Sequence, residues 1–359
     1  MPNLGDKQKI VPDFRVLING TPIPIDVSTD LMTVVVQEDI EALSMFTLKL
    51  TNWDIQKHKV TWSDDERWFK MGNEVEIHMG YINHLEKLIN GEIIGLEPEF
   101  DVNEAPSVIV RGYDRRHRLL RGRYTQAFLQ IKDSEIVSQI ASSKEVNLTP
   151  KVEDTKVKLD YVLQHNQTHW EFLQERAQRI GYEVVVEDKI LYFRPHQNAD
   201  SPVLMLDLDT DLMEFYPRLT TLPEVGQVKV RGWNPKKKAE IVGLAKAGDE
   251  GTMMGGSTTG PTTANQTFGS AINTSVKRPV FNQGEANQIA LGYLKDMALE
   301  YITGEGTSIG RTDLRAGKVL NIQGIGKRFS GNYYMTSTTH IYLPKRGYRT
   351  RFTVRRNAT

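Results

Sequence analysis

The sequence predicts a mainly β fold in which a small α/β unit is inserted between two β units. Three observations predict this fold class. Short segments of alternating apolar and polar residues fill residues 10–115, and segments of the same kind return after residue 203. Between them, residues 168–193 have the pattern of one helix followed by two strands. Many short strands without long helices between them are typical of a sandwich or a small barrel.

Length and composition allow two or three domains. The 359 residues are 39% hydrophobic and 25% charged, which is ordinary for a globular chain that buries real cores. We expect two related β-barrel domains, residues 1–118 and 203–359, and an α/β insertion domain, residues 119–202. The second barrel is expected to be interrupted by a flexible loop, 245–277, and by a helix, 282–302.

The overall charge excludes several classes of partner. Lys and Arg together number 45, as do Asp and Glu, so no net field attracts nucleic acid or an anionic membrane. The absence of cysteine excludes disulfides and thiolate metal sites. No run approaches the ~18 apolar residues of a membrane span, and the first residues lack the apolar core of a secretory signal. We therefore expect a chain that is not an integral membrane protein and is assembled in a bacterial cytoplasm.

The first β unit begins with a hairpin signal. Asn19 and Gly20 separate two apolar arms, residues 16–18 and 23–25, although Pro22 and Pro24 restrict the second arm to a sheet edge. Later strands are predicted from alternation, or from short apolar runs, at Phe46, Leu48 and Leu50, at Val75, Ile77 and Met79, and at Val108, Ile109 and Val110.

The insertion carries complete helix punctuation. Thr168 and Glu171 have the spacing of a capping box, and Gly181 stands where a helix would end in a left-handed residue. Strands are expected at residues 182–186 and 190–193. Asp133 is predicted to cap a shorter helix. The predicted buried stripes of the two helices are Trp170, Leu173, Ala177 and Ile180, and Ile136, Val137, Ile140 and Ala141.

Two short echoes suggest that the β units are related. Residues 228–234 repeat the pattern of 108–114, and residues 317–322 repeat that of 72–77. The echoes do not occur in the same order in both halves, so chance recurrence of strand fragments stays open as the alternative.

The segment between Glu250 and Lys277 contains no charged residue and is rich in Gly, Ser and Thr. This composition predicts a flexible loop. Asn282 and Glu285 are then expected to begin a helix whose buried side includes Ile289.

No candidate for catalysis or metal binding has the context that its chemistry requires. Ser308 lies in a G-x-S-x-G pattern, but a helix precedes it and a strand is expected after it, the reverse of a nucleophile elbow. His165 and His169 are four apart, yet the helix begins only at Thr168 and no third ligand is near. The repeated aspartates at 207–211 lack the Gly and Glu of an EF-hand loop and are read as one acidic strand face. We expect no enzyme activity, cofactor or metal.

Charge is segregated along the chain. Residues 314–359 hold ten Lys or Arg, no acid, and interleaved aromatics, a pattern typical either of single-strand nucleic-acid binding or of docking on acidic protein subunits. Residues 183–214 are correspondingly acidic, which favours pairing between subunits or domains over nucleic acid. The candidate subunit-interface charges are Arg349, Arg351, Arg355 and Arg356, and Asp207, Asp209 and Asp211.

Three motifs in order resemble the phage late control D family, which comprises baseplate hub proteins of contractile tails and includes the hub half of VgrG. The first is Gln164-x-Asn166-x-Thr168-x-Trp170-x-Phe172-Leu173, with Arg176-Ala177 and Gly181-Tyr182. The second is Gly324-x-Gly326, Phe329-Ser330-Gly331-x-Tyr333-Tyr334, Thr339-His340 and Gly347-Tyr348-Arg349-Thr350-x-Phe352. The third is Val110-Arg111-Gly112-Tyr113-Asp114 with Leu119. Together they span residues 108–356.

The resemblance implies a structural hub rather than an enzyme. It implies a homotrimer whose six barrels adapt a hexameric inner tube to a trimeric spike, with inner tube protein, a separate spike protein and other baseplate subunits as partners and no small-molecule substrate. The chain stops just after its last strand signal, so the spike is expected on another protein. Whether the particle is a phage tail, an extracellular device or a membrane-anchored one stays open, as does its cargo. A nucleic-acid-binding module and a hydrolase are the alternative functions.

Overall fold

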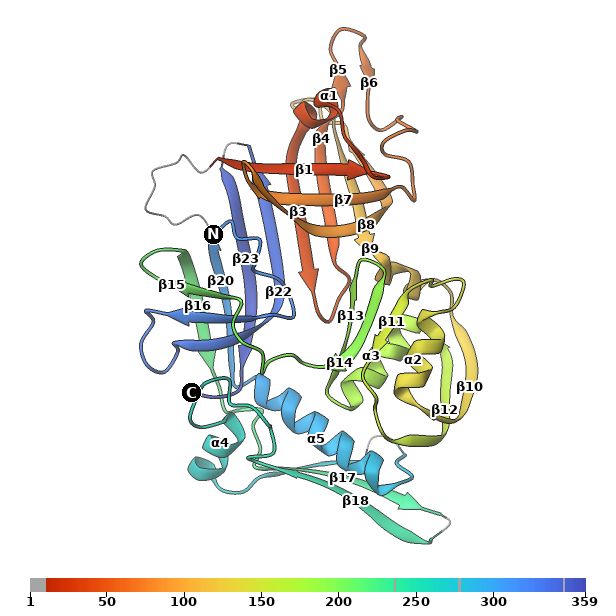
Figure 1. The fold of residues 1–359 in the computed structure, drawn as a ribbon, viewed down its shortest axis with the longest axis vertical. Helices are drawn as coiled ribbons and strands as arrows, with labels where there is room; N and C mark the ends of the chain where they lie inside the picture. The colour runs from red at the N-terminus through yellow and green to blue at the C-terminus, as the bar shows by residue number, and fades with distance from the viewer. Residues whose placement is uncertain (1–10, 236, 277–278, 345) are drawn as a thin grey trace.

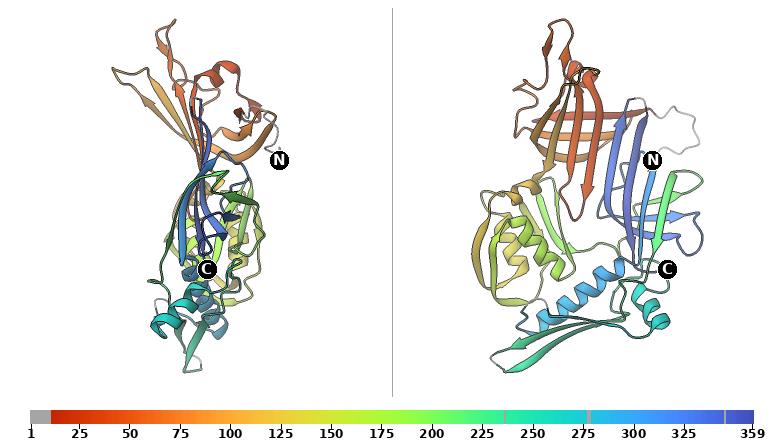
Figure 2. Two further views of the ribbon diagram at one scale, coloured as in Figure 1. Left: turned by 90° about the vertical axis from the view of Figure 1, so that its left-hand side faces the viewer. Right: turned by 180° about the vertical axis from the view of Figure 1, so that it is seen from behind.

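The computed structural model describes residues 11–235, 237–276, 279–344 and 346–359 (Figure 1). Lys345, one of the basic residues counted above, lies outside these ranges, as do Lys277 and the N-terminal segment 1–10. The molecule is elongated, with the β5–β6 hairpin at one end and the β17–β18 hairpin at the other (Figures 1 and 2).

One sheet of 13 strands runs through most of the molecule. Its main path is β16-β20-β23-β22-β3-β4-β9-β8-β7-β1-β2, and β21 pairs with β22 and β15 beside that path. The mainly β class with an α/β insertion is confirmed, and in the described part of the chain the path stays open, since no strand pair joins its two ends. The strands are β1 (Pro12–Ile18), β2 (Thr21–Pro22), β3 (Leu31–Asp39), β4 (Met45–Thr51), β7 (Glu74–Tyr81), β8 (His84–Glu99), β9 (Ser107–Asp114), β15 (Leu204–Asp207), β16 (Leu212–Leu219), β20 (Ile302–Ile309), β21 (Val319–Gln323), β22 (Gly331–Leu343) and β23 (Gly347–Arg356).

Strand β22 joins the two β units. Its later half pairs with β3, Ser337 opposite Asp39, while its first residues pair with β21, Tyr334 opposite Val319. The first and last parts of the sequence therefore share one hydrogen-bonded sheet, and the packing of one unit constrains the other.

The first unit confirms the Asn19-Gly20 turn. Both residues have positive φ, 50° and 77°, and Ile18 is opposite Thr21. The second arm is only two residues long because helix α1 (Ile25–Asp30) begins directly after Pro24. The small hairpin β5 (Trp53–Asp54) and β6 (Lys59–Val60) projects from this unit. The predicted inward residues of β4 and β7 are buried in one cluster, Phe46, Leu48, Leu50, Val75, Ile77 and Met79.

The insertion has its own core. Its elements are the 3-10 helix η1 (Arg115–Leu120), β10 (Tyr124–Lys132), α2 (Asp133–Ala141), β11 (Thr149–Val152), β12 (Lys158–Gln167), α3 (His169–Arg179), β13 (Tyr182–Glu187) and β14 (Ile190–Pro195). The capping box at Thr168 and Glu171 is confirmed, as is the left-handed Gly181 with φ of 67°. Both helices bury the predicted stripes in this core, apart from Trp170, which packs at its margin.

The predicted cap of α2 is wrong. Glu135 rather than Asp133 bonds the start of the helix, accepting from the backbone N–H of Lys132 at 2.9 Å. The carboxylate of Asp133 instead binds Arg176 of α3, with N–O distances of 2.6 and 2.9 Å. A long-range ion pair has thus taken the side chain that local pattern assigned to a cap.

A second, smaller sheet accompanies the long helix of the last unit. Helix α5 (Gln283–Leu299) is capped by Asn282 as predicted and packs on β17 (Gln227–Asn234) and β18 (Ala239–Lys246). One echo therefore joins strands of different sheets, because β17 is separate from the large sheet that contains β9. The other echo, β21 with β7, lies within the large sheet, and both strands follow a left-handed glycine, Gly317 and Gly72.

The prediction of a flexible loop over 245–277 is wrong. The segment contains helix α4 (Gly260–Phe268) and strand β19 (Ile272–Ser275), which pairs in parallel with β17. Thr259 caps α4, Pro261 stands in its first turn, and Met254 is buried. The cap, the proline and the pairing of β19 with β17 order this segment although it lacks charge.

Candidate interface charges and buried polar junctions

Side chains of strand β23 alternate between buried and exposed positions, and this separates the predicted basic residues from the core residues between them. Arg349 and Arg351 are exposed, while Tyr348, Thr350 and Phe352 between and beside them are buried. The exposed arginines are therefore available on one face of the large sheet, as a subunit-interface role requires.

The two arginines that end the strand are used within the chain. Arg355 pairs with Glu41 at 2.8 Å and with Glu300 at 3.1 Å, linking β23 to the first unit and to the end of α5. Arg356 is only 2% exposed; its guanidinium lies over the Tyr333 ring and donates to the carbonyl of Ser330 at 3.0 Å. Arg356 thus lies in the interior of the chain rather than on a surface.

The three aspartates do not form the predicted acidic strand face. Only Asp207 belongs to a strand, and its Oδ1 accepts from the backbone N–H of Asp209 at 3.0 Å in the turn between β15 and β16. Asp211 pairs with Arg311 at 3.4 Å. Within the ranges that the structure describes, no hydrogen bond or ion pair joins these aspartates to the candidate arginines of β23.

Four aromatic residues of the basic segment are part of the core, and a fifth, Tyr342, is half-buried against Phe14. Tyr333, Tyr334, Tyr348 and Phe352 are each at most 5% exposed. Base stacking requires exposed ring faces, so these side chains cannot provide the platform on which the nucleic-acid alternative depended.

The candidate catalytic and ligand residues have structural contacts. Ser308 lies inside β20 rather than at a turn, and its hydroxyl donates to the carbonyl of Ile309 at 2.8 Å. His169 is the first residue of α3 and stacks on Tyr124 with ring centres 4.0 Å apart, whereas His165 is exposed on β12. Among the described residues no three His, Cys, Asp or Glu side chains gather as metal ligands.

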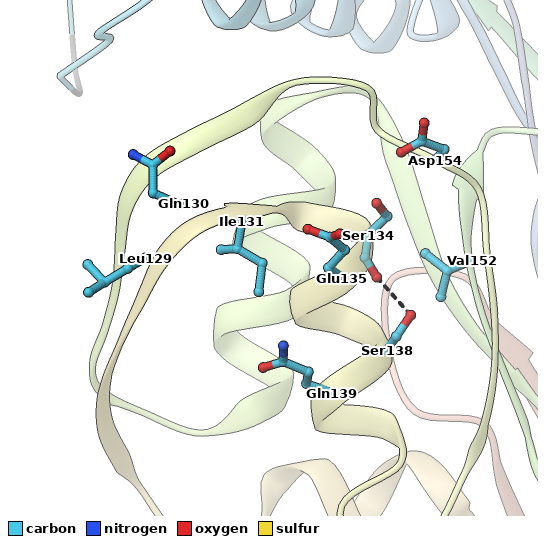
Figure 3. Close-up of a pocket in the computed structure, with 9 residues that line it drawn as sticks. All are labelled: Leu129, Gln130, Ile131, Ser134, Glu135, Ser138, Gln139, Val152 and Asp154. Carbon is cyan, nitrogen blue, oxygen red and sulfur yellow. Dashed lines mark hydrogen bonds between the residues drawn. The ribbon is translucent and has the colours of Figure 1, made fainter.

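A cleft of about 560 Å³ opens between α2 and the ends of β10 and β11 (Figure 3). Its polar groups are already engaged: Ser138 donates to the Ser134 carbonyl at 2.8 Å, and Asp154 pairs with Lys132 at 2.8 Å. Its nine lining residues include two serines but no histidine, lysine or cysteine that could activate a nucleophile. The arrangement offers no acyl-transfer chemistry.

Several residues of the family signature make contacts within the fold. Gln164 is fully buried, donating to the Gln167 carbonyl at 3.0 Å and accepting from Gln126 at 2.9 Å. The guanidinium of Arg116 lies over Trp170 and donates to Asp114 at 2.7 Å. The signature thus holds the insertion together and docks it on the first unit.

Glu183 forms a buried junction between the insertion and β22. Its carboxylate accepts from Arg194 at 3.0 Å, from His196 at 3.2 Å and from the hydroxyl of Tyr334. Burial raises the pKa of Glu183, but the bonds from His196, Tyr334 and Arg194 outweigh it and hold the pKa below its usual value. The sequence offered a signal for part of this junction, because Glu183 and Arg194 are opposite each other in the predicted hairpin.

His196 extends this junction to helix α5. Its Nε2 lies 3.3 Å from Asp296, so the ring bridges two carboxylates. Burial lowers the pKa of His196, yet hydrogen bonds to Asp296 and Glu183 raise it to about 9. The ring is therefore charged at neutral pH and ties three segments together.

Arg315 joins the two β units at a second junction. It donates to Glu38 of β3 at 2.7 Å and to the carbonyls of Lys87 and Leu88 at 3.1 and 2.6 Å. A cleft of about 260 Å³ lies beside it, where β3, β8 and the β13–β14 turn meet. Lys87 also pairs with Asp188 of that turn at 2.8 Å. The insertion and both β units are thus fastened at one place.

Glu92 collects positive charge at the end of the first unit. Arg115, His117 and Arg118 of η1 all contact its carboxylate, Arg115 at 3.0 Å and His117 at 2.7 Å. Burial raises the pKa of Glu92, but the bonds from His117 and Arg118 lower it to about 2. The junction fixes the chain where it leaves β9 for the insertion.

Glu224 is the opposite case. Both carboxyl oxygens are buried without a hydrogen-bond partner, and a β-carbon at Gly260, the first residue of α4, would lie 2.8 Å from the carboxyl carbon. Burial first, then the charges of Glu250 and Glu300, raise the pKa of Glu224 to about 8. Glu224 is therefore neutral at pH 7.

Comparison with known proteins gives the same fold. Residues 8–342 match the family model described as the Alg8 N-terminal domain. No curated protein matches the sequence. The part of the chain that the structure describes contains no helix long and apolar enough to span a bilayer.

The structure is similar to the 43 kDa tail protein of prophage MuSo2 from Shewanella oneidensis, with 12% identity, a TM-score of 0.69, and coverage of 96% of this chain and 98% of that one. A tail protein from Neisseria meningitidis MC58 is also similar, with 12% identity, a TM-score of 0.68, and coverage of 96% of both chains. The E. coli c3393 protein has 14% identity and a TM-score of 0.62, with coverage of 96% of this chain and 77% of that one. It is described as a type VI secretion component similar to the T4 tail proteins gp27 and gp5. The resemblance indicated by the three motifs is thus confirmed at the level of the fold.

Proposed function

The chain belongs to the Alg8 N-terminal domain family, and from its likeness in fold to tail proteins we propose that it is a structural baseplate hub of a contractile tail or injection system. It forms a homotrimer that adapts a hexameric inner tube to a trimeric spike. Its partners are the inner tube protein, a separate spike protein and other baseplate subunits. The observation that carries the proposal is the likeness in fold to two tail proteins, one of them from a prophage, over 96% of the chain.

The proposed mechanism is geometric. The two β units, residues 1–118 and 203–359, act as two related barrels, so three chains present six such units to the tube. The α/β insertion, residues 119–202, braces them from the side. Support comes from the Gly72 and Gly317 echo, and from the sheet that β22 continues from one unit into the other.

The buried junctions suit such a role. Glu38 with Arg315, and Glu183 with Tyr334, connect segments that are far apart in sequence. A hub that passes force from tube to spike needs units that move together, and buried charge pairs break only at high cost. We assign the chain no chemistry of its own.

Tube nucleation tests the proposal. Purified inner tube protein is mixed with the wild-type chain and spike protein, and tube length and number are counted by electron microscopy. The proposal predicts short tubes that each carry the chain at one end, and more tubes as its concentration rises. Tube formation that is unaffected by the chain, with no chain at tube ends, would overturn it.

Ser308→Ala is the matched control for the enzyme alternative. Its hydroxyl is buried in β20, so the variant is expected to nucleate tubes like the wild type. Loss of a measurable hydrolysis in this variant would revive the hydrolase reading.

A further inference from the structure

The three-stranded sheet β18–β17–β19 has two different faces. Its inner face packs on α5 through Val228, Val230 and Ile241. Its outer face, defined here as the arm face, carries the alternate residues of the same strands, Gln227, Lys229, Arg231, Trp233, Glu240, Val242, Leu244, Lys246, Ile272 and Thr274.

The arm face has an apolar centre and a basic surround. Trp233 is 57% exposed, and Leu244 and Ile272 are also exposed. Residues 227–246 contain six Lys or Arg and a single acid, Glu240, which pairs with Arg231. Exposed Trp beside Arg is the composition of an interface centre, and the excess positive charge calls for an acidic partner.

The opposite end of the molecule carries a matching surface. The tip formed by the end of β8 and the turn after it, residues 97–104, has four acids and no basic residue. Glu97 and Glu99 pair with Arg111 and Lys49 of the same chain, so Asp101 and Glu104 are the acids that the tip offers to a neighbour. Phe100 is 65% exposed and Val102 fully exposed. Asp101 accepts from the backbone N–H of Asn103 at 2.8 Å, which fixes the bend of the tip.

One chain cannot join these two surfaces to each other. The backbone N–H of Asn52 donates to the Pro106 carbonyl at 2.7 Å, which places the tip beside the β5–β6 hairpin. That hairpin lies at the far end of the long axis from β17–β18 (Figures 1 and 2). A contact between tip and arm face must therefore join two molecules.

We propose that the arm face is the receptor for the β8–β9 tip of a neighbouring copy of this chain. Phe100 and Val102 cover Trp233 and Leu244, and the acids of the tip face the surrounding lysines. Such a contact uses a different surface on each partner, so repeating it closes a ring or extends a filament. The inference rests on the proposed trimeric hub, in which the ring closes after three chains.

Cysteine cross-linking tests the contact directly, because the natural chain has no cysteine. Asn103→Cys marks the tip and Thr274→Cys marks the arm face, and neither change removes an apolar anchor. The double variant is oxidised and run on a non-reducing gel. We expect a ladder that ends at three chains, while each single variant gives dimers at most.

A matched control keeps the tip cysteine and moves the other. Leu222 is 90% exposed but lies outside the arm face. The double variant Leu222→Cys with Asn103→Cys should therefore give no ladder. Charge reversal supplies a second measurement: Lys229→Glu with Lys246→Glu, or Asp101→Lys with Glu104→Lys, should each weaken self-association about tenfold or more, and their combination should restore it.

The outcomes separate this inference from the proposed function. A wild-type trimer by light scattering without a cross-linked ladder would overturn the tip–arm contact and leave the hub standing. A ladder that runs past three chains would support the contact but contradict a trimeric ring. A wild-type chain that stays monomeric, also in the presence of the spike protein, and that fails to cross-link would overturn both.

Discussion

Glu183 and Glu224 are both buried glutamates, 3% and 5% exposed, yet their surroundings are opposite. Glu183 receives Arg194, His196 and Tyr334 from two different parts of the chain, and its pKa is lowered. Glu224 has no hydrogen-bond donor on either oxygen, and its pKa is raised to about 8.

The two sites show two ways in which this fold accommodates a buried carboxyl group where segments meet. Where the insertion meets β22 and α5, charge is kept and shared among several segments, which fixes their relative position. Where the β16–β17 connection meets the start of α4, charge is suppressed by protonation instead. The first joint is expected to be rigid and the second sensitive to pH.

The largest expected effect comes from removing the satisfied carboxylate. Glu183→Ala leaves Arg194 buried without its acceptor and leaves His196 with Asp296 alone, and it should destabilise the protein by about 3–5 kcal/mol. Denaturant unfolding measures the change, and Glu187→Ala, at the exposed end of the same strand, should stay within about 0.5 kcal/mol of wild type. Equal effects in the two variants would show that the Glu183 junction contributes no special stability.

The unsatisfied carboxyl should respond in the opposite direction. Glu224→Gln removes a group whose pKa in the folded state, about 8, exceeds its ordinary value of 4.5. The folded state binds the extra proton between these values, so wild-type stability is complete below pH 4.5 and falls as pH rises through 8. The variant should therefore gain roughly 3 kcal/mol at pH 7 and nothing near pH 4.

Unfolding curves from pH 4 to 9 test this difference. A parallel pH dependence in wild type and Glu224→Gln would mean that Glu224 does not carry the proton. Glu183→Gln, the same chemical change at the satisfied site, should be destabilising across the whole range.

A smaller effect is expected where α5 approaches the corner before Glu183. A β-carbon at Gly292 would lie 2.6 Å from the carbonyl carbon of Ile180, so Gly292→Ala should cost about 1–3 kcal/mol. Gly284→Ala on the same helix meets nothing closer than 3.4 Å and should be neutral or stabilising by up to about 1 kcal/mol. The melting temperatures of the two variants test this prediction. A stabilised Gly292→Ala would indicate that α5 is not packed tightly against Ile180.

Local pattern predicted the elements well and their long-range partners poorly. The capping box at Thr168, the glycine at 181 and the turn at Asn19 were readable because each depends on residues close in sequence. Asp133, by contrast, was assigned to a cap and binds Arg176, 43 residues away. No periodicity carries information of that kind.

The candidate charges show the same limit. Alternation along β23 could have indicated that Arg349 and Arg351 share one face of the strand. It could not show that Arg356 turns onto Tyr333, because that contact depends on how β22 and β23 pair. The surroundings of Glu224 had no sequence signal, since Glu250, Gly260 and Glu300 come from separate parts of the chain.

The mass of the purified protein in solution tests the central claim, that this chain is a trimeric hub, most directly. Light scattering is recorded over a range of concentrations at two salt levels, with and without the spike protein. A trimeric hub gives a particle of three 40.8 kDa chains. A mass of one chain at every concentration, also in the presence of the spike protein, would contradict it.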